Sequence, residues 1–239
     1  MLIYPSNELT YEGYSPHAEY SNFIEPKAFD KLLLEFPSDG LFKTEEPEYR
    51  KHNQRPHWRR LMCYADKKVF AKYKNLHQYL VSPSNLPDVW QSMVETIAHG
   101  KEYREWVSKT LSIKDFDIRL DWHRTRSGLD ASPHVDSAGK LGSHLFYFMP
   151  NGWKDEFGGK TVFYKNNKTE KSNPEPSDFE SSIEIPVVGN RSMIFKNVTK
   201  GWHGVTQIRL ESSLDAAILH RQILNVVLLK RDIQHDSMV

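Results

Sequence analysis

The feature that most constrains the fold is a change in the sequence pattern near Asp115. From there on, short segments rich in β-branched and aromatic residues alternate with clusters of Gly, Pro, Asn and Ser. Short strands at such spacing are typical of an all-β sandwich or barrel. The segments expected to form strands are 116–124, 132–137, 143–149, 160–165, 183–188, 192–196, 202–208 and 221–230. The polar stretch 165–182 is expected to be a surface loop between two of them.

The first part of the chain has a helical pattern instead. Apolar residues recur at helical spacing around 26–36, 88–99 and 101–111. The strand-rich part has too few strands on either side of its polar loop to close as two separate barrels. We therefore expect one domain over 1–239, with a mostly helical support region at 1–112 and a jelly-roll core at 113–231.

Charge and composition exclude several classes of protein. The 32 basic and 31 acidic residues leave a net charge of +1, so the chain as a whole does not look like a nucleic-acid binder. No apolar run approaches the roughly 18–20 residues of a membrane helix, and the first residues lack a secretory pattern. Cys63 is the one cysteine, which excludes an internal disulfide and a multi-thiolate metal site. We expect a cytoplasmic protein with no membrane partner.

One stretch, 50–74, is strongly basic. Trp58, Tyr64 and Tyr73 are interleaved with its charges, a pattern that indicates an anionic partner such as nucleic acid or a ribonucleoprotein. The alternative, a solvated face neutralised by acids elsewhere in the fold, is the commoner case and the one we expect. The basic residues are Arg50, Lys51, Arg55, Arg59, Arg60, Lys67, Lys68, Lys72 and Lys74, against the single acid Asp66.

Three residues are candidate metal ligands. His134 and Asp136 are two positions apart in an expected strand, so their side chains point to the same side. His203, flanked by glycines at the start of another β-branched segment, is the best candidate for a third ligand. Two histidines and one carboxylate form the facial triad of non-haem Fe(II) oxygenases. By spacing alone the pair is weak evidence, because surface histidines with ordinary partners are more common.

The surroundings of these residues match a known family in four ordered places. These are Arg126-Ser127-Gly128 ahead of Pro133-His134-x-Asp136; segment 145–149 leading to Phe157-Gly158-Gly159-Lys160-Thr161-Val162-Phe163; segment 186–195 ahead of Trp202-His203-Gly204-Val205; and Arg221 opening the last segment. In this set, which covers about half of the chain, the sequence resembles the Fe(II)/2-oxoglutarate-dependent dioxygenases, and within them the prolyl 4-hydroxylase-like branch.

The resemblance implies an α+β, mainly β fold. Its core would be a double-stranded β-helix, the jelly-roll or cupin-like arrangement, with N-terminal supporting helices. It also implies an enzyme that holds Fe(II) through the catalytic residues His134, Asp136 and His203. With O2 and 2-oxoglutarate as cosubstrates, and ascorbate as an optional reductant, it would hydroxylate a C–H bond and release succinate and CO2. The expected substrate is a peptidyl-prolyl, amino-acid or other small molecule.

By the same resemblance, Arg221 anchors the far carboxylate of 2-oxoglutarate, which a buried arginine fork can bind. The interval from His203 to Arg221 is longer than is common in the family, so Arg209 competes for this role. Thr125 stands where relatives often have a tyrosine, and His123 or Tyr147 could take over its contacts.

Asn225 stands between apolar residues of the last segment and is expected either to face the cavity or to lie at the barrel edge. The alternative function is a jelly-roll protein that binds a metal or a sugar without redox chemistry. Such a protein would keep the three candidate ligands but would not need Arg221.

Overall fold

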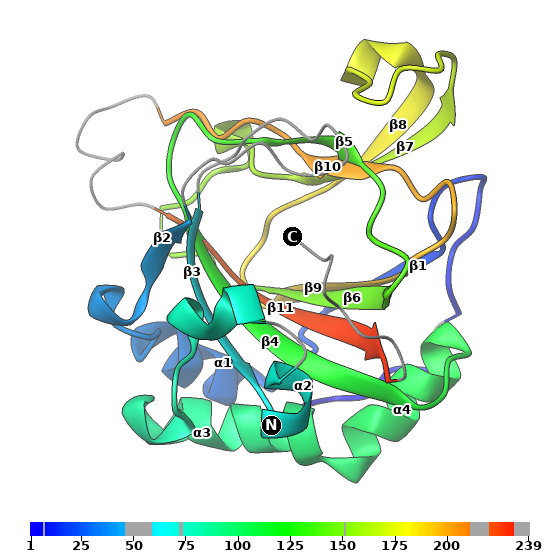
Figure 1. The fold of residues 1–239 in the computed structure, drawn as a ribbon. Helices are drawn as coiled ribbons and strands as arrows, with labels where there is room; N and C mark the ends of the chain where they lie inside the picture. The colour runs from blue at the N-terminus through cyan, green and yellow to red at the C-terminus, as the bar shows by residue number, and fades with distance from the viewer. Residues whose placement is uncertain (7, 46–58, 72–73, 151, 211–219, 232–239) are drawn as a thin grey trace.

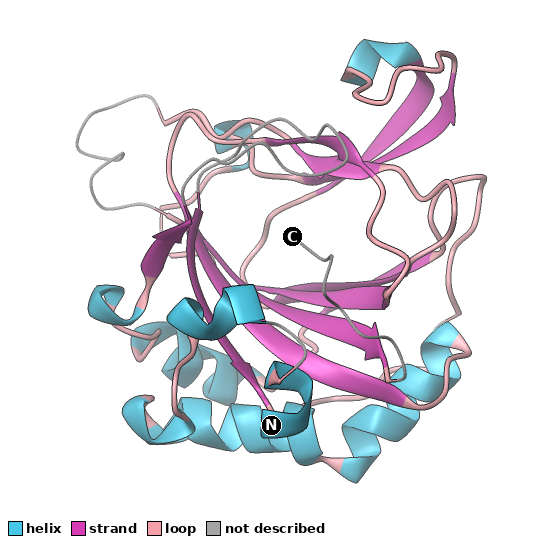
Figure 2. Cartoon of the chain, in the orientation of Figure 1, coloured by secondary structure: helices cyan, strands magenta, loops and turns pink. Residues whose placement is uncertain are grey.

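The computed structural model describes residues 1–6, 8–45, 59–71, 74–150, 152–210 and 220–231. Within them, two antiparallel sheets face each other, and most of the helices cover the outer side of the larger sheet (Figure 1, Figure 2). In the view of Figure 1 the smaller sheet lies at the top, the larger sheet in the middle and the helices at the bottom.

The two sheets form a double-stranded β-helix. The larger sheet has the strand order β1-β9-β6-β11-β4-β3-β2 and the smaller one β5-β10-β7-β8. From β4 onward the chain passes back and forth between them, which confirms the expected jelly-roll core. The strands are β1 His17–Ser21, β2 Lys43–Glu45, β3 Arg59–Ala65, β4 Phe116–Thr125, β5 Ala131–His134, β6 Lys140–Tyr147, β7 Thr161–Asn167, β8 Phe179–Ile185, β9 Arg191–Lys196, β10 His203–Val205 and β11 Arg221–Lys230.

The first 112 residues contain the expected helices, but they also contribute β1, β2 and β3. These strands extend the larger sheet at both edges, where β1 pairs with β9 and β3 pairs with β4. Within the described residues, no helix is long and apolar enough to cross a membrane. The helices are α1 Pro26–Leu34, α2 Lys67–Phe70, α3 Asp88–Val94 and α4 Lys101–Leu111, with a π-helical turn at Glu95–His99 and short 3-10 turns at Asp39–Leu41, Lys74–Tyr79, Pro83–Asn85, Asp155–Phe157 and Pro176–Asp178.

Alternation along β11 separates two cores. Leu224, Val226 and Leu228 point outward into a large apolar cluster shared with the helices, which includes the fully buried Trp90 of α3. Ile223 points between the sheets, into a second cluster with Tyr147 and other residues. Successive side chains of a strand face opposite sides, so the outer core fixes which residues of the last strand face inward.

The β7–β8 region differs from the sequence expectation. Of the stretch 165–182, expected to be a loop, residues 168–178 do connect two strands, but 165–167 and 179–182 belong to the paired strands β7 and β8, which project from the smaller sheet (Figure 1). β8 begins at Phe179, and this ring packs against Tyr164 and Trp202 with centroid distances of 4.8 and 5.5 Å. One aromatic anchor thus holds a segment that is otherwise polar. β10 is shorter than the expected 202–208 and covers only His203–Val205.

Candidate metal centre

His134, Asp136 and His203 come together at the smaller sheet. His134 ends β5 and lies opposite His203, the first residue of β10, in the strand register. One ligand atom from each of the three side chains lies within 4.8 Å of the others, and the two imidazole centroids are 4.4 Å apart. The structure therefore brings together the three residues that the sequence predicts as metal ligands.

Both histidines are oriented by backbone carbonyls. Nδ1–H of His134 donates to the carbonyl oxygen of Ser132 at 2.8 Å, and Nδ1–H of His203 donates to that of Gly201 at 2.9 Å. Because a carbonyl can only accept, these bonds place the proton on Nδ1 and leave the Nε2 lone pair available. This is the tautomer that metal-binding histidines use when their second nitrogen is held by a hydrogen bond.

The two carboxylate oxygens of Asp136 have different environments. Oδ1 accepts from the ammonium group of Lys140 at 2.9 Å. Oδ2 is buried 3.7 Å from Nε2 of His203 and has no hydrogen-bond partner among the described residues. Unsatisfied buried acceptors are rare in proteins, so this oxygen fits a cation that bridges it to the histidines. The donor set, two imidazoles and a carboxylate, is the one that non-haem Fe(II) prefers.

The surrounding charges keep all three groups in their ligand forms. Burial, together with the neighbouring His203, lowers the pKa of His134 to about 3. Burial also lowers the pKa of His203. For Asp136 burial alone would raise the pKa, but the positive charge of Lys140 and the two histidines outweigh it and hold the pKa well below its usual range. Metal binding near neutral pH therefore does not need to displace a proton from any of the three.

The contacts that Lys140 and Asn197 make around Asp136 were not predicted from the sequence. The amide of Asn197 donates to the carbonyl oxygens of Ser137 at 3.0 Å and Lys140 at 2.8 Å, which closes the turn that follows Asp136. The spacing of four residues between Asp136 and Lys140 was the available signal for the ion pair. Asn197 lies far along the chain, and no sequence pattern connects it to this turn.

Arg221 is a buried cation on the inner face of the larger sheet. It is 3% exposed and forms no ion pair among the described residues. Its Nε–H donates to the carbonyl oxygen of Gly159 at 2.6 Å, and its guanidinium carbon lies 5.6 Å from the ring centre of Tyr147. Burial lowers the pKa of this guanidinium. A buried charge without a counter-ion is strongly unfavourable, so this position fits an anionic ligand.

Gly159 makes the burial of Arg221 possible. It has a φ of +72°, and a Cβ at this position would lie 2.9 Å from Cδ of Arg221. Only glycine combines this backbone conformation with such a close approach. The second glycine of the Gly158-Gly159 motif is therefore explained by its packing against the buried arginine, whereas a Cβ at Gly158 would lie 2.2 Å from the carbonyl oxygen of Gln207.

The other predicted cosubstrate residues lie near Arg221. Thr125 is opposite Arg221 in the strand register, and His123 is opposite Ile223 on the same inner face. The hydroxyl of Tyr147 is hydrogen-bonded to that of Thr161 at 2.8 Å. The structure thus groups Arg221, Tyr147, Thr125 and His123 at one end of the space between the sheets.

Arg209, the competitor for the anchor role, lies elsewhere. It is exposed, and its Nε–H donates to Oε1 of Gln207 at 3.1 Å. An exposed arginine binds a carboxylate in competition with water, whereas Arg221 is already desolvated. The geometry favours Arg221 over Arg209.

The basic stretch 50–74 lies partly outside the described residues. Arg50, Lys51, Arg55 and Lys72 fall in the parts that are not described. Arg60 donates to the carbonyl oxygen of Asp39 at 2.8 Å and forms an ion pair with its carboxylate. One member of the stretch is therefore neutralised by an acid from elsewhere in the fold, and contact with nucleic acid through this stretch stays a prediction.

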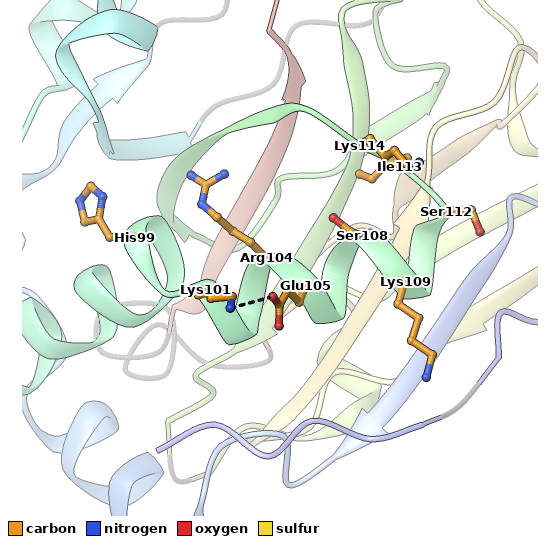
Figure 3. A pocket seen from close by; sticks show the side chains of 9 residues that line it. All are labelled: His99, Lys101, Arg104, Glu105, Ser108, Lys109, Ser112, Ile113 and Lys114. Atoms are coloured by element: carbon orange, nitrogen blue, oxygen red, sulfur yellow. Dashed lines mark ion pairs between the residues drawn. The ribbon is translucent and has the colours of Figure 1, made fainter.

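A groove of about 690 Å³ lies on the helical side of the molecule, along α4 (Figure 3). Its charges are largely engaged within the protein. Lys101 pairs with Glu105 at 3.6 Å, and Arg104 donates to the carbonyl oxygens of Ala98 and Phe116. The groove contains none of the candidate metal ligands and lies on the other side of the larger sheet from them (Figure 1).

Solved structures with this fold are known, although the sequence itself has no close match. No protein-family model matches the chain, and neither does any curated protein. A prolyl-4-hydroxylase from Pseudomonas putida superposes with a TM-score of 0.57 at 11% identity, over 90% of this chain and 93% of the other. The non-haem α-ketoglutarate-dependent carbocyclase SnoK of nogalamycin biosynthesis gives a TM-score of 0.53 at 8% identity, over 93% and 84%.

A third structure agrees with these two. An oxidoreductase of the 2-oxoglutarate-Fe(II) oxygenase family from Burkholderia pseudomallei gives a TM-score of 0.51 at 12% identity, over 90% of this chain and 83% of the other. The likeness in all three cases is one of fold. The chain has the double-stranded β-helix fold of the 2-oxoglutarate-Fe(II) oxygenases, among them prolyl 4-hydroxylases, as the sequence resemblance implies.

Proposed function

We propose that the protein is an Fe(II)- and 2-oxoglutarate-dependent oxygenase that hydroxylates a C–H bond of its substrate. The observation that carries this proposal is a pair of unsatisfied groups between the two sheets. One is the buried oxygen Oδ2 of Asp136 beside two oriented histidines, and the other is the buried, unpaired cation of Arg221. A divalent metal satisfies the first, and a dicarboxylate that reaches from the metal to the arginine satisfies the second.

Each residue has a defined part in this function. His134, Asp136 and His203 would hold the iron on one side and leave its other positions open. Bound Fe(II) and 2-oxoglutarate supply the oxidative chemistry, in which O2 is consumed and succinate and CO2 are released. Arg221 would bind the far carboxylate, and Tyr147 would cover the guanidinium and exclude water from it. We also infer that residues 1–239 form one catalytic domain.

The test is the visible spectrum of the protein under anaerobic conditions, after addition of Fe(II) and then 2-oxoglutarate. We expect a charge-transfer band in the wild type and none in His134→Ala, because chelation of 2-oxoglutarate requires bound iron. Arg221→Ala should keep its affinity for Fe(II) but need about 100-fold more 2-oxoglutarate to develop the band, since a desolvated charge partner is lost. Arg209→Ala is the matched control and should behave like the wild type.

The alternative function, a non-redox barrel that binds a metal or a sugar, predicts a different result. Such a protein would bind the metal but would give no 2-oxoglutarate-dependent band, and Arg221→Ala would have no effect on ligand binding. This outcome in a folded protein contradicts the oxygenase proposal. Addition of ascorbate to the turnover assay tests the separate prediction that it serves as a reductant.

A further inference from the structure

The inner face of the larger sheet combines apolar and polar positions. On β6 and β9 it carries Leu145, Met193 and other members of one apolar cluster. The inward positions of β4 are polar, whereas on β11 the inward Ile223, Val227 and Leu229 are apolar and Asn225 is polar, as is one position of β6. The proposed function gives some of these polar residues no role. We call them the polar wall: Arg119 and Asp121 of β4, Ser143 of β6 and Asn225 of β11.

The strand register places Ser143, one end of the polar wall, near the candidate metal centre. The ring of Phe195 on β9 lies 5.0 Å from the ring of His203, centroid to centroid. Ser143 is the partner of Phe195 on the next strand, Val227 is the partner of Ser143, and Arg119 is the partner of Val227. One row of inward-facing residues therefore runs from beneath the metal ligand to Arg119.

The next row contains the other half of the polar wall. Asn225 is opposite Asp121 on one side and Leu145 on the other. It also shares the inner face of β11 with Arg221, four residues earlier. Along the strands, Asn225 and Asp121 therefore lie between two levels. On one side is the row beneath the metal centre, and on the other is the end of the space between the sheets where Arg221 is located.

Two atoms of the polar wall lack partners. Oδ1 of Asn225 and Oγ of Ser143 are buried without a hydrogen bond among the described residues, and Ser143 is only 1% exposed. Beside them, Asp121 is 3% exposed and accepts from Nε and Nη2 of Arg119 at 2.9 and 2.7 Å. Buried polar atoms are almost always paired, so these two atoms indicate a partner that the described residues do not supply, such as a bound ligand.

We propose that the polar wall binds the substrate, and that the substrate is a small molecule that donates hydrogen bonds through hydroxyl or amino groups. This inference rests on the proposed function. Asn225 Oδ1 and the Asp121 carboxylate accept hydrogen bonds, and the Ser143 hydroxyl both donates and accepts. A prolyl residue has neither a side-chain donor nor a backbone N–H, and would leave these acceptors unsatisfied, as would an aliphatic chain.

A turnover assay with pooled probes tests the substrate class. The iron-loaded protein is given 2-oxoglutarate and O2, and succinate release is measured with three pools: free L-amino acids with polyols, prolyl peptides, and straight-chain fatty acids. We expect the first pool to raise succinate release about tenfold or more, because sites built to hydrogen-bond a substrate discriminate strongly against analogues that lack the donor. Stimulation by only the second or third pool, or by none, overturns the inference.

Variants of polar-wall residues test whether these residues bind the compound that stimulates succinate release. Asn225→Val and Ser143→Ala should each raise the KM for the stimulating compound about tenfold or more, while the Fe(II)–2-oxoglutarate charge-transfer band stays unchanged. Gln222→Leu is the matched control, because Gln222 lies on the same strand as Asn225 but faces the helices. If both wall variants keep the wild-type KM, the polar wall does not bind the substrate.

The Fe(II)–2-oxoglutarate charge-transfer band distinguishes a failure of the proposed function from a failure of the substrate inference alone. If the wild type gives no band, the proposed function fails and the inference fails with it. If the band is present but the polar pool does not stimulate succinate release, only the substrate inference fails.

Discussion

The two faces of β11 make opposite contributions to the protein. The outward residues Leu224, Val226 and Leu228 are all buried and apolar, and they pack against the helices. The inward face includes Arg221, which has no anionic partner among the described residues, and Asn225, whose Oδ1 has no hydrogen-bond partner among them. Burying apolar area stabilises the fold, whereas burying unsatisfied polar groups destabilises it. The comparison indicates that packing on the helical side compensates for the cost of keeping unsatisfied polar groups on the inner face.

The largest expected effect is the loss of metal affinity when a candidate ligand between the sheets is removed. His203→Ala should weaken Fe(II) binding by more than about 100-fold. Losing a residue that only hydrogen-bonds a metal ligand costs up to about 100-fold in affinity, and losing the ligand itself should cost more. Its free energy of unfolding without metal should change little, because the buried imidazole is replaced by a side chain with no polar group to satisfy. Titration with Co(II), followed by its d–d spectrum, measures the affinity, and chemical denaturation measures the stability. Retained Co(II) affinity would show that His203 is not a ligand.

A substitution on the outer face of β11 should give the reverse result, a loss of stability without a loss of metal affinity. Leu224→Ala should lower the free energy of unfolding by about 2–5 kcal/mol, as for large-to-small changes in a packed core. Co(II) affinity of the folded variant should stay close to that of the wild type. Urea denaturation and the same titration measure the two quantities. A large loss of metal affinity in the folded variant would mean that the two faces are not separable.

Lys140 tests whether the metal-free site depends on its counter-charge. In the metal-free protein, Lys140→Met should lower the free energy of unfolding by about 1–3 kcal/mol, because it leaves the Asp136 carboxylate buried and unpaired. Saturating Co(II) should remove most of this difference, since the cation then compensates the carboxylate.

The matched control for Lys140 is the double variant Lys140→Met/Asp136→Asn. It has no unpaired charge, and without metal it should recover stability relative to the single variant. A single variant that is as stable as the wild type at all metal concentrations would contradict this role.

The stability of the metal-free protein should also depend on pH, by a small amount per pH unit. The pKa of His134 is lowered to about 3 and that of His203 is lowered too, so both stay neutral in the folded state while the unfolded chain takes up protons below about pH 6.5. The unfolded state then binds more protons, and stability falls as pH falls. Since each histidine that stays neutral contributes up to about 1.4 kcal/mol per pH unit, the metal-free protein should lose at least about 1 kcal/mol per pH unit between pH 6.5 and 4. Asp136, whose pKa is also lowered, adds to this loss only below about pH 4.

Denaturant unfolding at several pH values measures this slope. The double variant His134→Gln/His203→Gln should have a flatter profile, because its amides do not titrate. The same slope in both proteins would assign the acid sensitivity to other groups, such as the buried His144, whose pKa burial also lowers.

The strand-rich half and its ligands could be predicted because their signals are local. Alternation and turn residues mark β4 to β11, and Arg221 opens a recognisable final strand. The expected strand 132–137 was too long, because β5 ends at His134; Asp136 therefore reaches the site from the turn after the strand and not through strand alternation. β1 and β3 could not be found in this way, because their short segments become strands only through pairing with β9 and β4. Short strands of this kind are decided by tertiary context.

The polar wall depends on non-local information as well. Asn225 stood out as a polar residue between apolar ones, but its two possible positions, cavity or edge, could be separated only by the strand register. Ser143 gave no signal at all, because a serine in a strand is ordinary. Its importance comes from Phe195 and His203 on other strands.

The backbone hydrogen bonds of the two ligand histidines have a consequence for evolutionary drift. Each imidazole is held by the carbonyl oxygen two residues before it, at Ser132 and at Gly201. A point mutation can replace a side chain but cannot delete a carbonyl oxygen. The orientation of the ligands is therefore insensitive to the identity of the side chain at position 132, and only an insertion, a deletion or a backbone shift would remove it. A centre built in this way can persist while nearly all of the sequence around it changes.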